Sequence, residues 1–251
     1  MEHDGTHALV TGGGTGIGEG IARGLAEAGA QVTITGRRAD VLAAVAASHP
    51  NLHALPMDVS DEFSVREGIA EAARLRGPIQ ICVANAGIAE GGPFAKVSLA
   101  DWRRIMTTNL DGVFLTLQSA LATLPADAPA RMIVISSIAG LRGLKGAVSY
   151  TASKHAVIGL VRGLSEEYMR RPITFNAIFP GYVDTDMVRA VPKDVLQLWT
   201  KYDFRAGPLA GWSVGGGLRD RAVDELSHLR IPRQVGVDVF AGISAGDAQL
   251  L

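Results

Sequence analysis

The stretch Thr11-Gly-Gly-Gly-Thr-Gly-Ile-Gly18 decides the fold of this chain. It continues the short strand-like segment 7–11, and Ile17, Ile21 and Leu25 then recur at nearly helical spacing. Glycines permit positive φ angles and a close approach of the backbone to a ligand. The free amides at the start of a helix favour a phosphate group. The stretch therefore predicts a strand, a tight turn and a helix that together hold the pyrophosphate of a dinucleotide.

The rest of the chain repeats this alternation of strand and helix. Apolar runs predict strands at 31–35, 52–56, 79–85, 131–136 and 173–179, and helical spacing predicts helices around 65–72, 102–124 and 150–170. Apolar runs bounded by turn residues are typical of buried parallel strands. We therefore expect a single doubly wound α/β domain over 1–251, with a parallel sheet and helices on both of its faces.

Composition excludes several classes of function. The chain has 251 residues, 47% of them hydrophobic, and a mean hydropathy of +0.20, which is ample for a buried core. Its net charge of −1 gives no electrostatic basis for binding nucleic acid. No apolar run approaches the ~20 residues that a membrane span needs, and residues 1–6 do not resemble a signal peptide. The lone cysteine, Cys82, fits a reducing cytoplasm, and the scattered histidines predict no metal site.

A second motif carries the chemistry. Tyr150 follows Ser137 by thirteen residues, and Lys154 follows Tyr150 by four. A tyrosine hydroxyl has a pKa near ~10, and an ammonium one helical turn away would stabilise its phenolate and lower that value. Ser137 could orient a carbonyl by hydrogen bonding, with Ser136 as a rival for this role. Together with the glycine-rich turn, this motif predicts a hydride-transfer enzyme.

The end of the second predicted strand indicates which dinucleotide is bound. An acidic residue about 20 positions after the glycines would hold the ribose 2′-hydroxyl of NAD. This chain instead has Thr35-Gly-Arg-Arg38, and Arg37 or Arg38 could meet the 2′-phosphate of NADP. NADP(H) is therefore preferred, and Asp40 keeps NAD(H) open as the alternative.

Six motifs in order resemble the short-chain dehydrogenase/reductase family over roughly residues 5–188, most of all its bacterial 3-oxoacyl-thioester reductases and related alcohol dehydrogenases. The motifs are Thr11–Gly18, Asn85-Ala-Gly87, Asn109, Ser137, Tyr150-Thr-Ala-Ser-Lys154 and Pro180-Gly-Tyr-Val-Asp-Thr185. The resemblance implies a Rossmann-type fold and reversible NADP(H)-dependent interconversion of a ketone and a secondary alcohol. The alternative is a catalytically degenerate member that binds a dinucleotide and acts by association.

The resemblance also implies a role for each catalytic residue. Tyr150 would be the general acid in reduction and the base in the reverse direction. Lys154 would lower the pKa of Tyr150 and bind the nicotinamide ribose, while Ser137 would hold the substrate oxygen. Asn109 would anchor a water molecule that relays protons from Lys154.

Further residues are assigned to the cofactor. Within this set the resemblance places Asp58 and Val59 at the adenine, 85–87 at the ribose and 180–185 at the nicotinamide. The full set is Gly12, Thr15, Gly16, Ile17, Gly18, Arg37, Arg38, Asp58, Val59, Asn85, Ala86, Gly87, Tyr150, Lys154, Pro180, Gly181, Val183 and Thr185.

The substrate is less well defined by the sequence. We expect a substrate loop at 187–209, and its apolar side chains suggest an apolar or aromatic substrate or a loop that merely packs on the core. These side chains are Met187, Val191, Leu196, Leu198, Trp199, Tyr202 and Phe204. Arg142 and Lys145 could meet an anionic substrate or the coenzyme A phosphate of an acyl thioester, or be plain surface charges.

The C-terminal segment 203–251 is atypical for the family. The usual glycine-closed last strand is missing, Gly215-Gly-Gly217 would not suit a helix, and 235–240 is the remaining candidate for the last strand. The segment is either a frame-shifted reading of the gene or a divergent tail, and translating the coding DNA in the other two frames tests this. We expect a homo-oligomer, a tetramer or a dimer, whose assembly is weakened if the tail is aberrant.

Overall fold

The computed structural model describes residues 2–181, 183, 195–203, 212–221 and 234–243, the last three ranges as backbone alone. The chain divides into two compact units, Met1–Met187 and Val188–Leu251. This division differs from the single domain expected over 1–251. Its boundary lies where the family's sequence pattern weakens.

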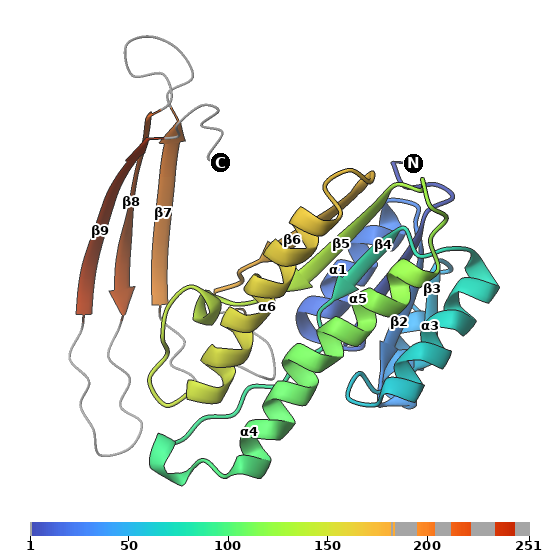
Figure 1. Cartoon of the computed structure of the whole chain (residues 1–251), viewed down its shortest axis with the longest axis horizontal. Helices are drawn as coiled ribbons and strands as arrows, with labels where there is room; N and C mark the ends of the chain where they lie inside the picture. The colour runs from blue at the N-terminus through green and yellow to red at the C-terminus, as the bar shows by residue number, and fades with distance from the viewer. Residues whose placement is uncertain (1, 182, 184–194, 204–211, 222–233, 244–251) are drawn as a thin grey trace. The chain divides into compact units, whose positions relative to one another are not determined.

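The first unit contains a parallel sheet of six strands in the order β3-β2-β1-β4-β5-β6 (Figure 1). The strands are β1 His7–Thr11, β2 Gln31–Gly36, β3 Leu52–Pro56, β4 Ile81–Ala84, β5 Ala130–Ile135 and β6 Ile173–Ile178. The direction of winding reverses between β1 and β4, and this is the point at which doubly wound sheets bind ligands. The predicted parallel α/β architecture is confirmed.

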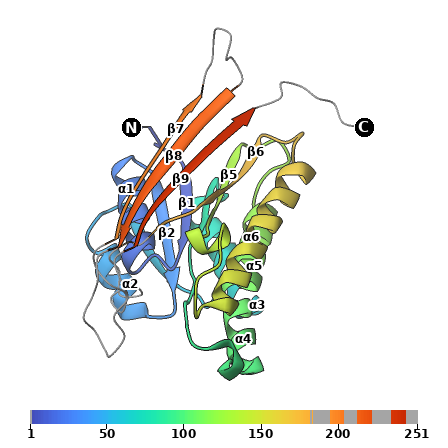
Figure 2. The same ribbon diagram turned by 90° about the vertical axis from the view of Figure 1, so that its left-hand side faces the viewer.

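Helices cover both faces of this sheet, with α1 and α2 on one side and α3 to α6 on the other (Figure 2). The helices are α1 Gly16–Glu27, α2 Ala39–Ala46, α3 Glu62–Arg76, α4 Leu99–Met106, α5 Gly112–Ala122 and α6 Val148–Glu167, with short 3-10 turns η1 Phe94–Lys96 and η3 Ile138–Gly140. Among the described residues, no helix combines the length and apolar character that crossing a bilayer requires.

Strand β1 separates two hydrophobic cores. Leu9 packs into the core beneath α3, α5 and α6, whereas Ala8 and Val10 pack into the core beneath α1 and α2. Successive side chains of a strand point to opposite faces, so a strand buried on both faces must be apolar throughout. All five residues of β1 are buried, which explains its unbroken run of largely apolar residues.

The helix predicted at 102–124 is interrupted. A π-helical turn, η2 Thr107–Asp111, separates α4 from α5. Such turns insert one extra residue into a helix and occur often at functional sites. Gly112 follows the turn directly, and a Cβ atom there would lie 3.0 Å from the carbonyl oxygen of Val59. The interrupted helix therefore packs tightly against the loop after β3.

The second unit contains an antiparallel sheet in the order β7-β8-β9. The strands are β7 Val195–Asp203, β8 Trp212–Arg221 and β9 Gln234–Ile243. The run 235–240 lies within β9 and pairs with β8, Phe240 opposite Gly215. The prediction that this run closes the parallel sheet as its last strand is therefore wrong.

Candidate active and cofactor site

The glycine-rich turn after β1 has the backbone conformation that its glycines suggest. Gly12 and Gly16 have φ angles of 64° and 57°, a region that favours glycine. A Cβ atom at Gly18 would lie 2.3 Å from the carbonyl oxygen of Gly12. The first turn of α1 therefore packs directly on the glycine-rich turn, as a site for phosphate at the start of a helix requires.

A cleft of about 230 Å³ opens beside this turn at the carboxyl ends of the strands. It extends from the turn past the end of β2 to the loops after β3 and β4. Eight residues that the sequence assigned to the cofactor line it: Gly12, Thr15, Arg37, Arg38, Asp58, Val59, Ala86 and Gly87. It is also lined by Thr108, in the π-helical turn, which sequence reasoning missed because its position depends on that turn.

The end of β2 carries cations at the cleft. Arg37 and Arg38 are exposed and line it, and Arg38 is the N-cap of α2. Asp40 lies in the first turn of α2, exposed, and is not among the lining residues. An anionic group in this part of the cleft would therefore meet two guanidinium groups and no carboxylate from this strand end.

Asp58 is anchored by the residues that follow it. Its Oδ1 accepts hydrogen bonds from the Ser60 amide at 2.9 Å and the Ser60 hydroxyl at 2.7 Å. Burial pushes the pKa of Asp58 upward, but the bonds from Ser60 and the charge of Arg37 outweigh it, so the pKa is lowered. The carboxylate is thus ionised at neutral pH and held in a fixed orientation at the cleft.

Asn85 fastens β4 to β1 where the winding of the sheet reverses. Its Nδ2 donates to the carbonyl oxygens of Thr11 at 2.9 Å and Gly12 at 3.3 Å. The Thr11 hydroxyl accepts from the amides of Asn85 and Ala86, both at 3.0 Å. These bonds hold the loop after β4 against the glycine-rich turn, and Gly12 and Ala86 on the two sides of this junction line the cleft.

Asn109 is fully buried in the π-helical turn and joins three segments. Its Oδ1 accepts from the Ile88 amide at 2.8 Å, and its Nδ2 donates to the Ile88 carbonyl at 2.9 Å and the Ser153 hydroxyl at 3.1 Å. Both amide hydrogens are thereby used within the protein. The side chain holds the loop after β4 against α6, beside Lys154.

Tyr150 and Lys154 lie one turn apart on α6, as their spacing predicted. The Lys154 Nζ is 5.7 Å from the centroid of the Tyr150 ring and donates to the Ile135 carbonyl at 2.8 Å. A Cβ atom at Gly87 would lie 3.6 Å from that Nζ. Helix α6 and the cleft therefore meet at Gly87.

Burial dominates the acid–base properties of this pair. It raises the pKa of Tyr150 above its ordinary value of 10.0, against a smaller lowering by a hydrogen bond with Ser137. It lowers the pKa of Lys154 to about 8. The predicted lowering of the Tyr150 pKa by Lys154 is therefore not found, because desolvation disfavours the charged form of each group.

The structure separates the two candidate serines. Ser137 caps the η3 turn, where its Oγ accepts a hydrogen bond from the Ala139 amide at 3.1 Å. Its side chain also forms the hydrogen bond that lowers the pKa of Tyr150. Ser136 points to the helix instead, and its Oγ donates to the Lys154 carbonyl at 3.0 Å. Ser137 is thus the serine placed to share a substrate oxygen with Tyr150.

The loop after β6 reaches this centre through Pro180. Pro180 follows β6, and its carbonyl accepts from the Ile138 amide at 3.1 Å, which brings the loop after β6 to the η3 turn. Gly181 and Val183 are exposed beyond it. Thr185 lies outside the described residues, as do Met187, Val191 and Phe204 of the predicted substrate loop, while the side chains of Leu196, Leu198, Trp199 and Tyr202 are not described.

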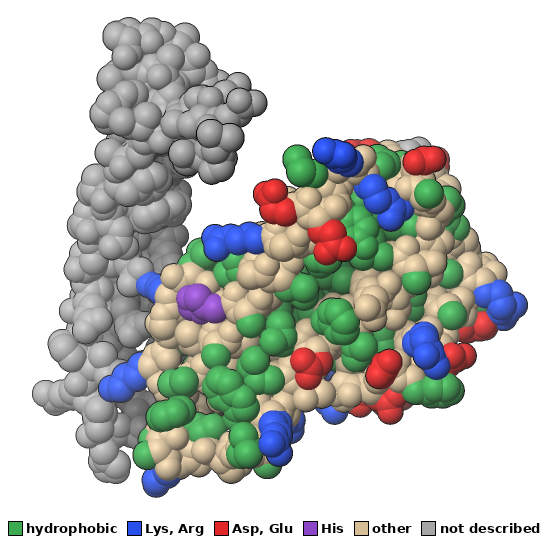
Figure 3. Space-filling view, in the orientation of Figure 1, with side chains coloured by type: hydrophobic (Ala, Val, Ile, Leu, Met, Phe, Trp, Pro, Cys, Tyr) green, Lys and Arg blue, Asp and Glu red, His purple; other side chains and the backbone are tan. Residues whose placement is uncertain are grey.

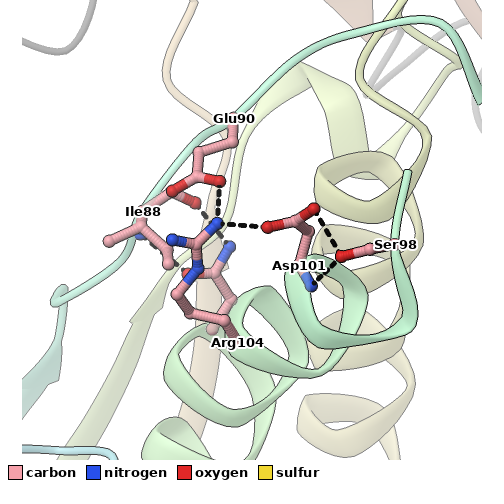
Figure 4. A network of polar contacts seen from close by, with 6 residues as sticks. Ile88, Glu90, Ser98, Asp101 and Arg104 are labelled. Atoms are coloured by element: carbon pink, nitrogen blue, oxygen red, sulfur yellow. Dashed lines mark hydrogen bonds and ion pairs between the residues drawn. The ribbon is translucent and has the colours of Figure 1, made fainter. Parts of the chain in front are cut away.

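A polar network fixes the loop after β4 to α4 (Figure 4). Arg104 contacts Glu90 of this loop and donates to Asp101 at 2.8 Å, while the Ser98 hydroxyl donates to Asp101 at 2.6 Å. Further along the loop, the Gly92 amide donates to the Gly146 carbonyl at 2.7 Å. The loop is thereby tied both to α4 and to the segment that precedes Tyr150.

Comparison with known proteins agrees with this geometry. Residues 6–196 match the family model described as short chain dehydrogenase. The 3-oxoacyl-[acyl-carrier-protein] reductase of Aquifex aeolicus is 35% identical over 198 residues, 77% of this chain and 80% of that protein. The acetoacetyl-CoA reductase of Rhizobium meliloti is 38% identical over 189 residues, 75% of this chain and 78% of that protein.

A solved structure supports the same relationship. The short chain dehydrogenase from Burkholderia cenocepacia, determined in complex with NADP, superimposes with a TM-score of 0.71 at 34% identity. The match covers 74% of this chain and 78% of that one.

Proposed function

Since the chain belongs to the short-chain dehydrogenase family of NAD(P)-dependent oxidoreductases, we propose that it transfers a hydride between NADP(H) and a ketone or secondary alcohol. The observation that carries the proposal is the meeting of Ser137, Tyr150 and Lys154 beside Gly87, at the end of the dinucleotide cleft. The cofactor, when bound, supplies or accepts the hydride. The residues of this chain bind it, orient the substrate and move the proton.

The residues present fit such a cofactor. The positive φ angles of Gly12 and Gly16, and the contact that leaves no space for a side chain at Gly18, form a cradle for the pyrophosphate. Asp58 and Val59 would border the adenine, and Ala86 and Gly87 would line the nicotinamide ribose together with Lys154. Pro180, Gly181, Val183 and Thr185 would complete the nicotinamide end.

Proton transfer follows from the burial of Tyr150. A raised pKa means that the hydroxyl keeps its proton at neutral pH and can give it to the strongly basic alkoxide oxygen that develops during reduction. Ser137 would donate a hydrogen bond to the same oxygen and so stabilise its charge. Lys154, whose Nζ lies beside Gly87, would bind the nicotinamide ribose. Asn109 would hold the loop after β4 beside these residues. It would also anchor a water molecule that relays protons from Lys154.

Two features support NADP(H) over NAD(H). Arg37 and Arg38 both line the cleft, and no carboxylate at the end of β2 would repel a 2′-phosphate. The related structure named above was solved with NADP. We therefore propose NADP(H) as the preferred cofactor and NAD(H) as the weaker one.

The substrate class is proposed from the relatives and from charge. The two curated relatives are named as reductases of 3-oxoacyl and acetoacetyl thioesters. Arg142 and Lys145 lie between the η3 turn and α6, close in sequence to both Ser137 and Tyr150. We propose that the ketone is the 3-oxo group of an acyl thioester, with these cations meeting the phosphates of its carrier.

The cellular setting is part of the same proposal. Cys82 is fully buried, and burial raises the pKa of its thiol to about 12, so it is an unreactive core residue compatible with a cytoplasmic protein.

Apolar side chains gather on the face formed by α4, α5 and α6 (Figure 3). Leu99 on α4 and Phe114 on α5 are 61% and 44% exposed, which supports a homo-oligomer.

The test measures the loss of NADPH absorbance with acetoacetyl-CoA and a panel of simple ketones. Turnover in the wild-type protein and its absence in Tyr150→Phe would support the proposal. The competing function is a dinucleotide-binding protein without activity. The one observation that favours it is that the family model ends at residue 196, so that most of the second unit has no counterpart in that model. Tight NADPH binding without turnover of any of these substrates would select that alternative.

A further inference from the structure

Lys154 is held at both ends by two consecutive residues where β5 ends. Its Nζ donates to the Ile135 carbonyl at 2.8 Å, and its own backbone carbonyl accepts from the Ser136 hydroxyl at 3.0 Å. Ser136 is 3% exposed and Lys154 5%, so water does not compete for these bonds. A backbone carbonyl in a helix already accepts one intrahelical bond. The bond from Ser136 is therefore additional and ties the middle of α6 to the sheet.

Gly140 permits this close packing. A Cβ atom there would lie 2.7 Å from the Lys154 carbonyl oxygen, 2.7 Å from the Ser136 Oγ and 2.9 Å from the Ile158 Cδ1. The φ angle of Gly140 is not positive, so its requirement for glycine is steric and not conformational. Any side chain at this position would push the η3 turn and α6 apart, because the nearest atom belongs to the helix backbone.

The segment that carries these contacts is itself fixed from the other side. The Ser136 amide donates to the Ile178 carbonyl at 2.8 Å, and the Ile138 amide donates to the Pro180 carbonyl at 3.1 Å. Because β6 and the loop after it restrain the segment, a displaced contact would move α6. Tyr150 and Lys154 would then move away from Ser137.

We propose that Ser136 and Gly140, with the Ile135 carbonyl, form a lysine seat that positions α6 so that Tyr150 and Lys154 meet Ser137. Ser136 and Gly140 are positioning residues in this account, and they do not touch the substrate. The inference rests on the proposed function for its catalytic consequence, but not for its geometry. A displacement of about 1 Å at such a site can lower the rate of the chemical step about 100-fold.

Gly140→Ala tests the steric contact, and Gly143→Ala is its matched control because a Cβ atom at Gly143 meets nothing within 4 Å. We expect kcat for reduction to fall about 100-fold in G140A and to change less than about twofold in G143A. The Kd for NADPH should change by a smaller factor than kcat, because Arg37 and Asp58 keep their places in the cleft although Lys154 moves. Ser136→Ala removes only the hydroxyl and should lower kcat about tenfold.

A second readout uses the ligand-free protein. Competitive acetylation of Lys154, quantified by mass spectrometry across pH, reports how well the seat buries the amine. We expect the pH of half-reaction to rise from about 8 toward that of an exposed lysine in S136A and G140A, and to stay unchanged in G143A. Circular dichroism of each variant corrects for any loss of folded protein.

These readouts separate the two proposals. If the wild-type protein reduces no ketone but the pH of half-acetylation of Lys154 rises in both variants, the lysine seat is supported and the proposed function fails. An unchanged Lys154 profile in both variants overturns the seat, whether kcat is retained or falls only in proportion to lost folded protein. If G140A does not fold, S136A alone decides by the same two outcomes.

Discussion

The ammonium nitrogen of Lys154 lies 5.7 Å from the centroid of the Tyr150 ring, one helical turn away on α6. Both side chains are largely removed from water, and burial moves their pKa values in opposite directions, Tyr150 upward and Lys154 down to about 8. The two pKa values, ordinarily 10.0 and 10.5, therefore lie further apart in this site, and Lys154 is the more acidic group. As pH rises, Lys154 therefore loses its proton before Tyr150 does, and Tyr150 keeps the proton that it is proposed to donate during reduction.

Replacing Tyr150 with Phe removes only the hydroxyl that is proposed to donate the proton. We expect kcat to fall about 1000-fold, within the usual range for loss of a general acid, while the Kd for NADPH changes little. Steady-state kinetics and NADPH fluorescence titration measure these two quantities. Tyr168→Phe is the matched control, since Tyr168 packs against Phe175 at the far end of α6. Retained turnover in Y150F would refute the assigned role of Tyr150.

Lys154 should make the ligand-free protein less stable than a neutral side chain would. Its folded pKa of about 8 is lowered from 10.5, so the unfolded state binds the proton more tightly and stability increases as pH rises from 8 to 10.5. Lys154→Met should therefore be inactive yet more stable at pH 7 by up to about 3 kcal/mol, less the lost bond to Ile135. Urea unfolding measures this difference, which should shrink toward pH 10. A difference that does not depend on pH would contradict the assignment.

Changing Arg37 to Asp should reverse the choice of cofactor. The cation at the cleft is replaced by a carboxylate, which would repel a 2′-phosphate and could accept a hydrogen bond from a 2′-hydroxyl. We expect the Kd for NADPH to rise about 100-fold and that for NADH to fall or stay constant. Arg66→Asp on the exposed face of α3 is the control for charge alone. Equal effects of R37D on both cofactors would mean that Arg37 does not read the phosphate.

Sequence could predict the strand–turn–helix units and the main site residues, because both follow from local patterns. The glycines of 11–18 and the spacing of Tyr150 and Lys154 each lie within a short stretch. The π-helical turn could not be predicted, since one inserted residue hardly alters apolar periodicity. The Ser136–Lys154 bond joins residues 18 apart through packing of η3 on α6, which no periodicity encodes. Strand β8 of the second unit could not be predicted either, because glycine-rich runs such as 215–217 carry little strand signal.

Acid should destabilise the protein through His7, a buried residue far from the catalytic motif in sequence. Its Nδ1 and Nε2 lie 2.8 Å from the Gly77 carbonyl and 2.9 Å from the Thr33 hydroxyl. Burial, and secondarily the charge of Arg76, lower the pKa of His7 despite the carbonyl bond. The unfolded state therefore takes up the proton first, and stability is lost as pH falls below 6.5.

Unfolding free energies at pH 7.5 and 5.5 test this prediction about His7. The wild-type protein should lose more stability between the two pH values than His7→Gln does. His155→Gln is the control, because His155 is exposed on α6. Equal losses in wild-type and H7Q proteins would show that other groups cause the acid sensitivity.

Assembly should depend on α5 and should stop short of a tetramer. Phe114 on α5 is 44% exposed. Apolar side chains gather on the face of α4, α5 and α6 (Figure 3), and that face offers a surface for a second copy. Among the described residues, no strand pairs with the outer edge of β6, and Ile178 on β6 is 48% exposed. A sheet with a further strand there would present a different edge for the assembly of more copies, and we expect that surface to be altered here. We expect a dimer by light scattering, and a monomer for Phe114→Asp. Met169→Asp, which changes a side chain 73% exposed beyond α6, should remain dimeric. A stable tetramer, or an F114D variant with unchanged mass, would contradict this prediction.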